Sequence, residues 1–242
     1  MQKTITIILI LLFNLNSFAQ IELKEFEPTN SFSADLSKKT ENEIKRQTEL
    51  LEKEKLTDKE TTELDTLVRK YGEVVESVWD IIDGGCSWYC GGGNYKVFAS
   101  SELDSTKTIS YSAKSANDLS YKTAWVEGKS NSGIGEYIEY YFENKSPRIN
   151  SVIISNGYQK SYSAWKNNNR VKKLKLYING TEFGILNLID SKTDQEFKLG
   201  TFGHNSDGSD LILRFEILEV YKGDKYNDTA ITEIYFDGID VH

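Results

Sequence analysis

The sequence predicts a mainly β fold, an antiparallel sandwich or jelly roll, preceded by a short α-helical hairpin. From Asn94 onward, short runs rich in Ile, Val, Tyr and Phe follow one another without helical patterns between them. Upstream, residues 37–82 are rich in Glu, Lys, Thr and Leu, contain no Pro and include a single glycine, Gly72. A glycine-rich stretch, Gly84–Gly93, separates the two parts, so we expect a helical segment over 20–83 and a β-domain over 84–242.

The helical hairpin is predicted by a capping signal and an apolar stripe. Thr57-Asp-Lys-Glu60 is a capping box, and it precedes apolar residues at spacings of three and four. These are Leu64, Leu67, Val68, Tyr71, Val74, Val75 and Val78. A weaker upstream stripe contains Ile44 and Leu51, which predicts two antiparallel helices that turn near Leu56-Thr57. Such a hairpin is either a packing element or a partner-binding coiled coil.

The β-domain is predicted from seven short runs, several of which alternate between apolar and polar residues. They are Tyr95–Ala99, Tyr137–Phe142, Ile149–Ser155, Val171–Ile178, Phe183–Ile189, Leu211–Val220 and Ile231–Phe236. Asn179-Gly180, directly after the fourth run, is a strong signal for a tight hairpin turn.

The N-terminus carries the pattern of a secretory signal peptide over residues 1–19. A basic start at Lys3 precedes an apolar run from Ile5 to Phe13, which is too short to span a bilayer and is followed by small residues before Ala19. Cleavage there gives a mature chain that begins at Gln20, is secreted or periplasmic and has no membrane span. An N-terminal membrane anchor is the alternative. Residues 20–36 show no period and predict a linker or an irregular start.

The net charge and the two cysteines limit the classes of partner and of site that the sequence allows. The formal net charge of −8 disfavours nucleic acid, because phosphate binding needs a basic surface. The only cysteines, Cys86 and Cys90, can form a local disulfide in an oxidising compartment. A zinc or redox site is the competing interpretation, although zinc normally takes four ligands.

Candidate ligand contacts lie in polar segments between the predicted strands. Trp125 and Glu127 offer a stacking face and a carboxylate, although Trp125 is also typical of a residue that seals the end of a sandwich. The long segment between two strands carries aromatic and amide side chains on a rigid scaffold. Its candidates are Asn156, Tyr158, Trp165, Asn169 and Arg170. A third loop, with Tyr221, Tyr226 and Asp228, is expected at the same end.

No catalytic set is recognisable. His204 lies in a polar turn without a nucleophile motif around it, and no pair of carboxylates stands out for glycoside hydrolysis. The sequence therefore predicts a protein that is not an enzyme.

Several motifs together resemble a known family. They are Ala99-Ser-Ser-Glu-Leu103, Ala116-Asn-Asp118, Thr123-Ala-Trp-Val-Glu-Gly128, Gly133-Ile-Gly-Glu136, Asn156-Gly-Tyr158, Asn168-Asn-Arg-Val-Lys172 and Tyr226-Asn-Asp-Thr-Ala-Ile-Thr-Glu233. The region from about Tyr95 to Val241 resembles the discoidin-like (factor V/VIII C-type), galactose-binding-like β-sandwich. The closest resemblance is to the NADase-type glycan-binding domain of secreted NAD glycohydrolase toxins. The enzyme of those toxins is a separate domain, so the resemblance implies no NADase activity here.

The resemblance implies a jelly roll that binds carbohydrate through loops at one end and holds a structural Ca²⁺ near the strand ends. Asp118, Thr123 and Glu233 match the positions of the calcium ligands, and hard oxygen donors suit this ion. We therefore expect a secreted, non-catalytic protein that binds a glycan or glycoconjugate. The alternative is an interaction or scaffold module that binds a protein of the cell envelope without glycan binding.

Overall fold

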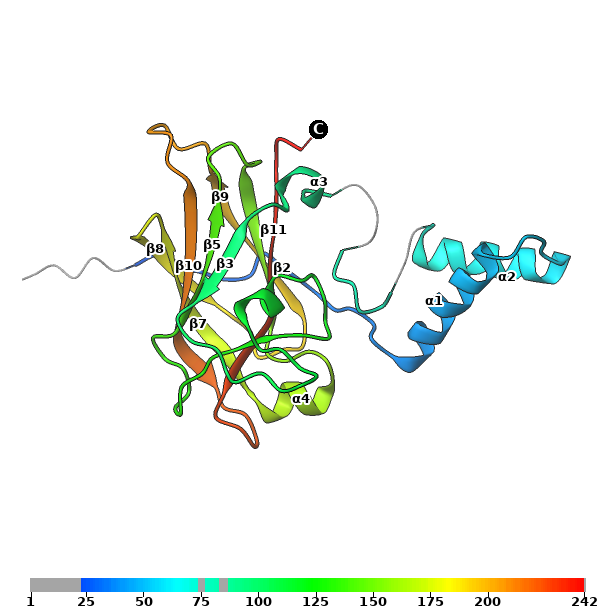
Figure 1. Cartoon of the computed structure of the whole chain (residues 1–242), viewed down its shortest axis with the longest axis horizontal. Coiled ribbons are helices and arrows are strands. Elements are labelled where there is room, and N and C mark those ends of the chain that lie inside the picture. Colours follow the sequence, from blue (N-terminus) through cyan, green and yellow to red (C-terminus); the bar gives the residue numbers. More distant parts are fainter. Residues whose placement is uncertain (1–22, 74–76, 83–86, 242) are drawn as a thin grey trace, which may run out of the picture.

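The computed structural model describes residues 23–73, 77–82 and 87–241. Within these ranges the chain forms a β-domain and a helical hairpin that projects from it (Figure 1). The helices are α1 (Lys38–Leu51), α2 (Asp58–Tyr71), α3 (Tyr89–Gly92), α4 (Tyr162–Asn167) and a 3₁₀ turn η1 (Ala113–Ala116). The strands are β1 (Glu25–Phe26), β2 (Asn30–Phe32), β3 (Lys96–Ala99), β4 (Trp125–Val126), β5 (Tyr137–Phe142), β6 (Ile149–Asn156), β7 (Asn169–Ile178), β8 (Thr181–Asn187), β9 (Asp194–Phe202), β10 (Leu211–Tyr221) and β11 (Thr229–Gly238).

The predicted β-sandwich is confirmed. The described strands follow the order β2-β9-β6-β11-β7-β10-β5-β3, with β8 beside β7 and β4 beside β11. Most pairs are antiparallel, but β1 runs parallel to β8, and β11 and β7 meet in parallel at their first residues, Thr229 with Asn169 and Ala230 with Arg170. This short parallel contact joins the two layers at the end of the sandwich where α4 lies (Figure 1).

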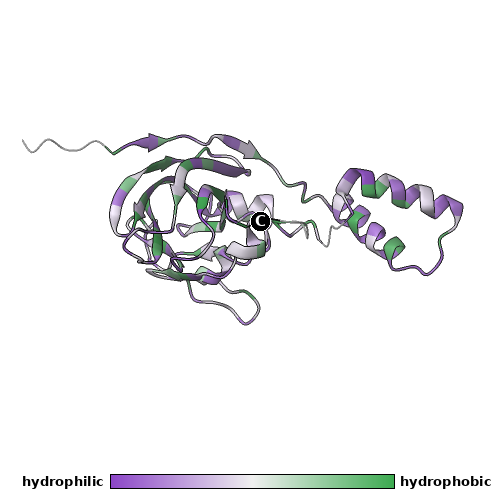
Figure 2. Cartoon of the chain, turned by 90° about the horizontal axis from the view of Figure 1, so that it is seen from above, coloured by the Kyte–Doolittle hydropathy of each residue, from purple (hydrophilic) through white to green (hydrophobic). Residues whose placement is uncertain are grey.

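One apolar core fills the space between the layers, because alternate residues of each strand point inward. Its largest fully buried side chains include Trp125, Tyr140, Phe142, Phe197 and Phe215. The hydropathy colouring shows polar residues alternating with apolar ones along the strands (Figure 2). Trp125 seals this core, as its sequence context allowed, and its indole N–H donates to the Ser101 carbonyl at 2.9 Å.

The predicted hairpin turn after β7 is also confirmed. Asn179 and Gly180 both have positive φ angles, 49° and 77°, which is the conformation that a two-residue type I′ turn requires. Ile178 and Thr181 then pair directly, and this pairing sets the register of β7 with β8.

The helical hairpin forms with its capping box intact, since the side chains and amides of Thr57 and Glu60 hydrogen-bond each other. The helices are antiparallel, with ion pairs from Arg46 to Glu63 at 3.0 Å and from Lys70 to Glu43 at 2.6 Å. Two details differ from the sequence expectation. Leu50 rather than Leu51 is buried, and α2 ends at Gly72 instead of continuing toward Val78.

The N-terminal segment differs from the expected linker, because β1 pairs with β8 and β2 pairs with β9. The helical hairpin is therefore inserted between two strands of one sheet. The predicted signal peptide, residues 1–19, lies outside the described residues, and so do Val74, Val75 and Cys86. Cys90 is an exposed free thiol in the structure, and its disulfide with Cys86 stays a prediction. No helix within the described residues is long and apolar enough to cross a membrane.

Candidate ligand-binding site

A cleft of about 480 Å³ opens at the end of the sandwich where β6, β7 and β11 meet α4. We call it the Tyr158–Tyr226 cleft. Its lining residues are Leu103, Tyr111, Val126, Tyr158, Ser161, Ser163, Ala164, Asn167, Asn168, Tyr226 and Asp228. It brings together the strand containing Val126, the segment from Tyr158 to Asn168 and the loop carrying Tyr226, which are three segments that the sequence analysis selected separately.

The floor of the cleft is apolar. Val126 and Tyr158 belong to a small buried cluster with Ala124 and Ala230, against which Leu103, Tyr111 and Ala164 pack. The Tyr111 and Tyr158 rings meet edge to face, with centroids 6.5 Å apart. Val126 is fixed between the two neighbouring segments, because its amide donates to the Tyr111 carbonyl and its carbonyl accepts from the Leu103 amide.

The helix α4 forms one wall. Ser161 caps its first turn, accepting from the Ala164 amide at 3.0 Å. The carbonyls of its last turn have no hydrogen-bond donor within the helix. Backbone amides of the facing loop donate to these carbonyls. The Asp224 amide donates to the Lys166 carbonyl at 3.0 Å, and the Tyr226 amide donates to the Asn167 carbonyl at 2.8 Å. These bonds hold Tyr226 opposite α4, and its side chain is 44% exposed.

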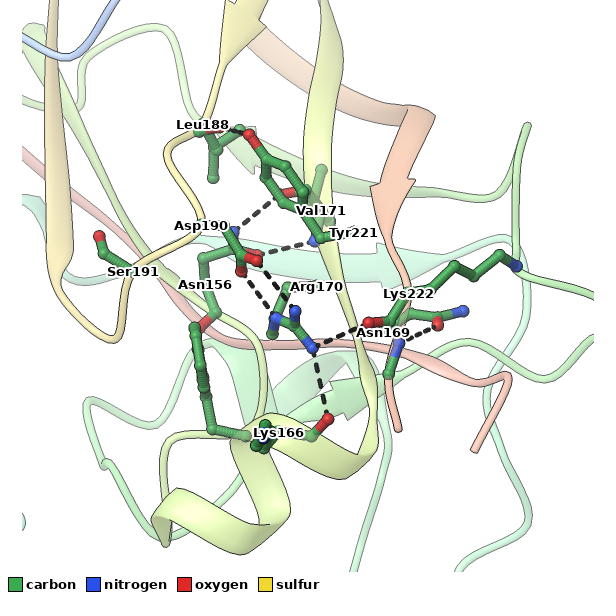
Figure 3. Close-up of polar contacts among 12 residues, drawn as sticks. Asn156, Lys166, Asn169, Arg170, Val171, Leu188, Asp190, Ser191, Tyr221 and Lys222 are labelled. Atoms are coloured by element: carbon green, nitrogen blue, oxygen red, sulfur yellow. Dashed lines mark hydrogen bonds and ion pairs between the residues drawn. The ribbon is translucent and has the colours of Figure 1, made fainter. Parts of the chain in front are cut away.

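Arg170 lies behind this wall with its hydrogen bonds taken up by the protein (Figure 3). Its guanidinium makes a two-point ion pair with Asp190, at 2.8 and 3.0 Å. It also donates to the carbonyls of Lys166, Asn168 and Lys222, at 3.0 to 3.4 Å. Only 6% of Arg170 is exposed, so it fixes α4 to the two adjacent loops.

The side chains of Asn156 and Asn169 also hold neighbouring segments together, as Arg170 does. The Asn156 side chain accepts from the Val171 amide at 2.9 Å and donates to its carbonyl at 2.7 Å, which replaces a strand pairing. The Asn169 side chain donates to the Asn227 carbonyl and accepts from the Gly223 amide. Both are fully buried. Asn169 therefore shapes the loop that carries Tyr226.

Trp165 and Glu127 are also buried in internal contacts. The Trp165 indole N–H donates to the Asn156 carbonyl at 3.1 Å, and the Arg170 guanidinium lies over its ring at 4.6 Å. The Glu127 carboxylate accepts from the amides of Lys129 and Thr229. Burial raises the pKa of Glu127, and the two amide bonds oppose that rise.

Of the seven residues expected to contact a ligand, only Tyr158 lines the cleft. Trp125, Glu127, Asn156, Trp165, Asn169 and Arg170 are buried around it, because each satisfies its polar atoms with the backbone or with another side chain. Tyr226 and Asp228, from the third loop, do line it. The lining residues missed by the sequence analysis include the small polar ones at the start of α4, Ser161 and Ser163, and their only signal was their place in a long polar segment.

The expected calcium ligands lie together on one side of the sandwich. The Thr123 hydroxyl donates to both Asp118 carboxylate oxygens, at 2.7 and 2.8 Å. One Glu233 oxygen, Oε2, accepts from the amides of Asp118 and Leu119. The other, Oε1, is buried and has no hydrogen-bond partner within the described part of the chain. Burial raises the pKa of Glu233 well above its usual range, and the negative charge of Asp118 adds to that rise.

This donor set fits a hard divalent cation, because two neighbouring carboxylates and an unsatisfied buried oxygen favour positive charge. It contains two carboxylates and one hydroxyl, and the remaining ligands would be backbone carbonyls. In the residues that the structure describes, no three His, Cys, Asp or Glu side chains are grouped so that they could hold a metal ion.

A search of solved structures finds several to which this chain is similar. A CBM32 domain from Clostridium perfringens, solved with GalNAc-β-1,3-galactose, is 17% identical over 62% of this chain and 99% of its own, with a TM-score of 0.42. An F5/8 type C domain from Bacteroides fragilis is 14% identical over 66% and 98%, with a TM-score of 0.44. An arabinofuranosyltransferase from Mycobacteria is 15% identical over 61% of this chain but 11% of its own, with a TM-score of 0.42.

No curated protein matches the sequence. The model of the family described as NAD glycohydrolase translocation F5/8 type C domain matches residues 88–237, which is more than half of the chain and nearly all of the β-domain. By this match, and with the discoidin-like sandwich that the structure shows, the chain belongs to the NAD glycohydrolase translocation F5/8 type C domain family.

Proposed function

We propose that this chain is a secreted, non-catalytic glycan-binding protein and that the Tyr158–Tyr226 cleft holds the sugar. The observation that carries the proposal is the cleft itself, which has an apolar floor, an exposed tyrosine on one rim and hydroxyl and amide groups on the other. A sugar ring has the matching chemistry, since its C–H face packs on aromatic and aliphatic surfaces while its hydroxyls need donors and acceptors. Membership of a family with an F5/8 type C domain supports it.

The charge of the lining favours an uncharged sugar. The residues that line the cleft include one carboxylate, Asp228, and no Lys, Arg or His. Arg170, which the sequence suggested for an anionic substituent, is held by Asp190 and three carbonyls behind the wall. Sialic or uronic acids would place a second negative charge near Asp228, and the lining residues themselves include no cation to compensate it, although the Lys225 ammonium lies 4.9 Å from the centre of the Tyr226 ring.

The buried residues around the cleft serve this function as positioning residues. Trp165 and Arg170 hold α4, Asn156 joins the ends of β6 and β7, and Asn169 shapes the 222–228 loop. Because a weak single-site ligand depends on a preformed pocket, these contacts limit the ordering that binding would otherwise require. We propose that they act on affinity through the shape of the cleft.

We also propose that Asp118, Thr123 and Glu233 hold a structural Ca²⁺. The support is the buried, unsatisfied Glu233 Oε1 next to the Asp118 carboxylate. The ion would offset the repulsion between the two carboxylates and stabilise the turn between them. This role is separate from sugar binding, because Asp118, Thr123 and Glu233 are not among the residues that line the cleft.

A glycan array followed by calorimetry tests the site. We expect the wild-type protein to bind a neutral sugar with a dissociation constant of about micromolar to millimolar. Tyr226→Ala should weaken binding roughly tenfold, and Asp228→Asn should weaken it or change the preferred sugar. The matched control is Tyr162→Ala, which removes another exposed tyrosine, 66% exposed on α4 but not part of the cleft.

Two results would contradict the proposal. If no neutral glycan binds and a cell-envelope protein is captured instead, the chain is the interaction module that the sequence left as the alternative. If glycan binding is found but Tyr226→Ala and Tyr162→Ala behave alike, the ligand lies outside the cleft.

A further inference from the structure

The segment that follows the helical hairpin, residues 77–82, pairs with the turn that carries the proposed calcium ligands. Asp80 and Ser120 form an antiparallel bridge. On either side of it, the Ile81 amide donates to the Leu119 carbonyl at 2.9 Å and the Tyr121 amide donates to the Trp79 carbonyl at 2.8 Å. Residues 79–81 therefore form a short ribbon with residues 119–121 of the β-domain.

Trp79 joins three parts of the molecule. The Lys122 ammonium lies 5.4 Å from the centre of its ring. The pKa of Glu41, on α1, is lowered mainly by its hydrogen bond to Lys38, with smaller contributions from a hydrogen bond to the Trp79 side chain and from the charge of Lys122. The Trp79 side chain thus contacts the 118–122 turn through Lys122, and its influence on the pKa of Glu41 indicates that it lies near the helical hairpin.

The opposite side of the same turn is held by two buried carboxylates. Glu233 accepts from the amides of Asp118 and Leu119, at 3.2 and 2.8 Å. Asp194 accepts from the Tyr121 hydroxyl at 2.5 Å. Leu119 has a φ angle of 55°, in the left-handed region that disfavours a leucine. Such a conformation persists only where its surroundings impose it, so the shape of the turn depends on these carboxylates.

We propose that calcium bound between Asp118 and Glu233 strengthens the docking of the Trp79–Ile82 segment and so fixes the helical hairpin on the β-domain. This inference rests on the calcium site proposed above. Without the ion, the buried Glu233 Oε1 has no partner among the described residues, and the turn lacks the bridge between Asp118 and Glu233 that the ion would provide. With it, the Leu119 carbonyl and the Tyr121 amide are held in the orientation that pairs with the segment. The coupling is reciprocal, so docking of the segment also raises calcium affinity.

Hydrogen exchange on the full chain tests the coupling directly. Calcium or a chelator is added, and exchange of the Ile81 and Tyr121 amides is measured beside calorimetric calcium binding. We expect calcium to slow exchange at both amides at least severalfold, and Asp118→Asn to abolish both the heat of binding and the slowing. Calcium that binds without changing exchange at these amides would overturn the inference. Absence of calcium binding to the wild type would overturn it at its premise, while glycan binding to the same sample reports separately on the cleft.

The reverse effect gives an independent measurement. Trp79→Ala should weaken calcium affinity roughly fivefold, within the usual range of coupling between sites. Leu51→Ala is the control, since it removes a 54% exposed leucine of the helical hairpin that is distant in sequence from the ribbon. Wild-type affinity in Trp79→Ala would contradict the coupling.

Discussion

Arg170 connects more elements at the cleft end of the sandwich than its neighbours do. It is the second residue of β7, pairs with Asp190 and donates to carbonyls on α4 and on the loop after β10. A guanidinium suits this position, because its planar set of donors can serve a carboxylate and several carbonyls together. The cleft wall thus depends on one buried cation that does not itself line the cleft.

Replacing Arg170 with Met should lower the free energy of unfolding by about 2 kcal/mol, less than for a fully buried pair because Asp190 is 37% exposed. The control is Lys172→Met, which removes a cation two residues away whose partner, Glu219, is also exposed. We expect that change to cost less than about 1 kcal/mol. Urea unfolding of both variants measures the difference, and equal losses of stability would show that the Arg170 contacts contribute no more than an exposed ion pair.

Asp194 makes stability depend on pH. Its carboxylate is buried on the outer side of the sheet and accepts from the hydroxyls of Ser155, Tyr121 and Tyr235. Burial raises its pKa above the ordinary 3.8, and the three hydroxyl bonds oppose that rise. In the window above 3.8, the folded protein therefore binds more protons than the unfolded one. Its contribution to stability is then lost as pH rises through that window.

In the variant Asp194→Asn, the free energy of unfolding should not show this decline as pH rises. We expect wild-type stability, relative to the variant, to be greatest near pH 4 and to decline toward neutral pH. The variant also differs in stability by a constant amount at all pH values, because its amide accepts fewer hydrogen bonds than the carboxylate. Unfolding free energies measured across this range give the comparison. A wild-type advantage that grows with pH would mean that the folded pKa is depressed instead.

The turn between β6 and α4 shows why single residues at this end are constrained. Gly157 has a φ angle of 76°, and a Cβ there would lie 2.6 Å from Arg170 Cγ and 2.7 Å from Trp165 Cδ1. The close approach of the backbone brings Tyr158 to the floor of the cleft and Trp165 against its wall. Only glycine meets both conditions, the left-handed angle and the short contact.

The substitutions Gly157→Ala and Gly180→Ala separate these two effects. Gly180 has nearly the same φ, 77°, but nothing within 4 Å of an added Cβ. Gly180→Ala should therefore cost roughly 1 kcal/mol from strain alone. Gly157→Ala should cost clearly more and should weaken glycan binding, because Arg170 and Trp165 must move. Thermal unfolding and calorimetry would show this, and equal costs would argue against a tightly packed wall.

Helices and strands could be predicted from the sequence where the local sequence pattern agrees with which residues are buried. The run Tyr137–Phe142 coincides with β5, and Asn179-Gly180 forms its turn, because pattern and turn chemistry act within a few residues. The strand β9 was missed because it begins Asp194-Gln-Glu, whose first two residues are buried only through contacts made by other strands. The helix α4 was missed because six residues carry too little periodicity. The ligand contacts depended most on tertiary structure, since an exposed and a buried asparagine look alike in sequence.

Across the whole molecule, the helical hairpin is held at both ends. The strand β2 precedes it and pairs with β9, and the ribbon at Asp80 follows it. Its own buried apolar residues are few, Ile44, Leu50 and Leu67. Two helices of this length are marginal alone in water, so attachment to the β-domain contributes to their order. The helix α4 lies at one end of the β-domain (Figure 1). The cleft is lined by residues of α4 and of loops outside the helical hairpin.

The central claim is that the Tyr158–Tyr226 cleft binds a neutral glycan, and mapping the bound sugar by NMR tests it most directly. Backbone resonances of the full chain would be followed while a neutral disaccharide such as GalNAc-β-1,3-galactose, or the best ligand from the array, is added. We predict that the largest shifts occur at Tyr158, Ser163, Asn168, Tyr226 and Asp228 and that they saturate. Saturable shifts confined to another surface, such as the exposed face around Phe98 and Tyr141, would contradict the claim.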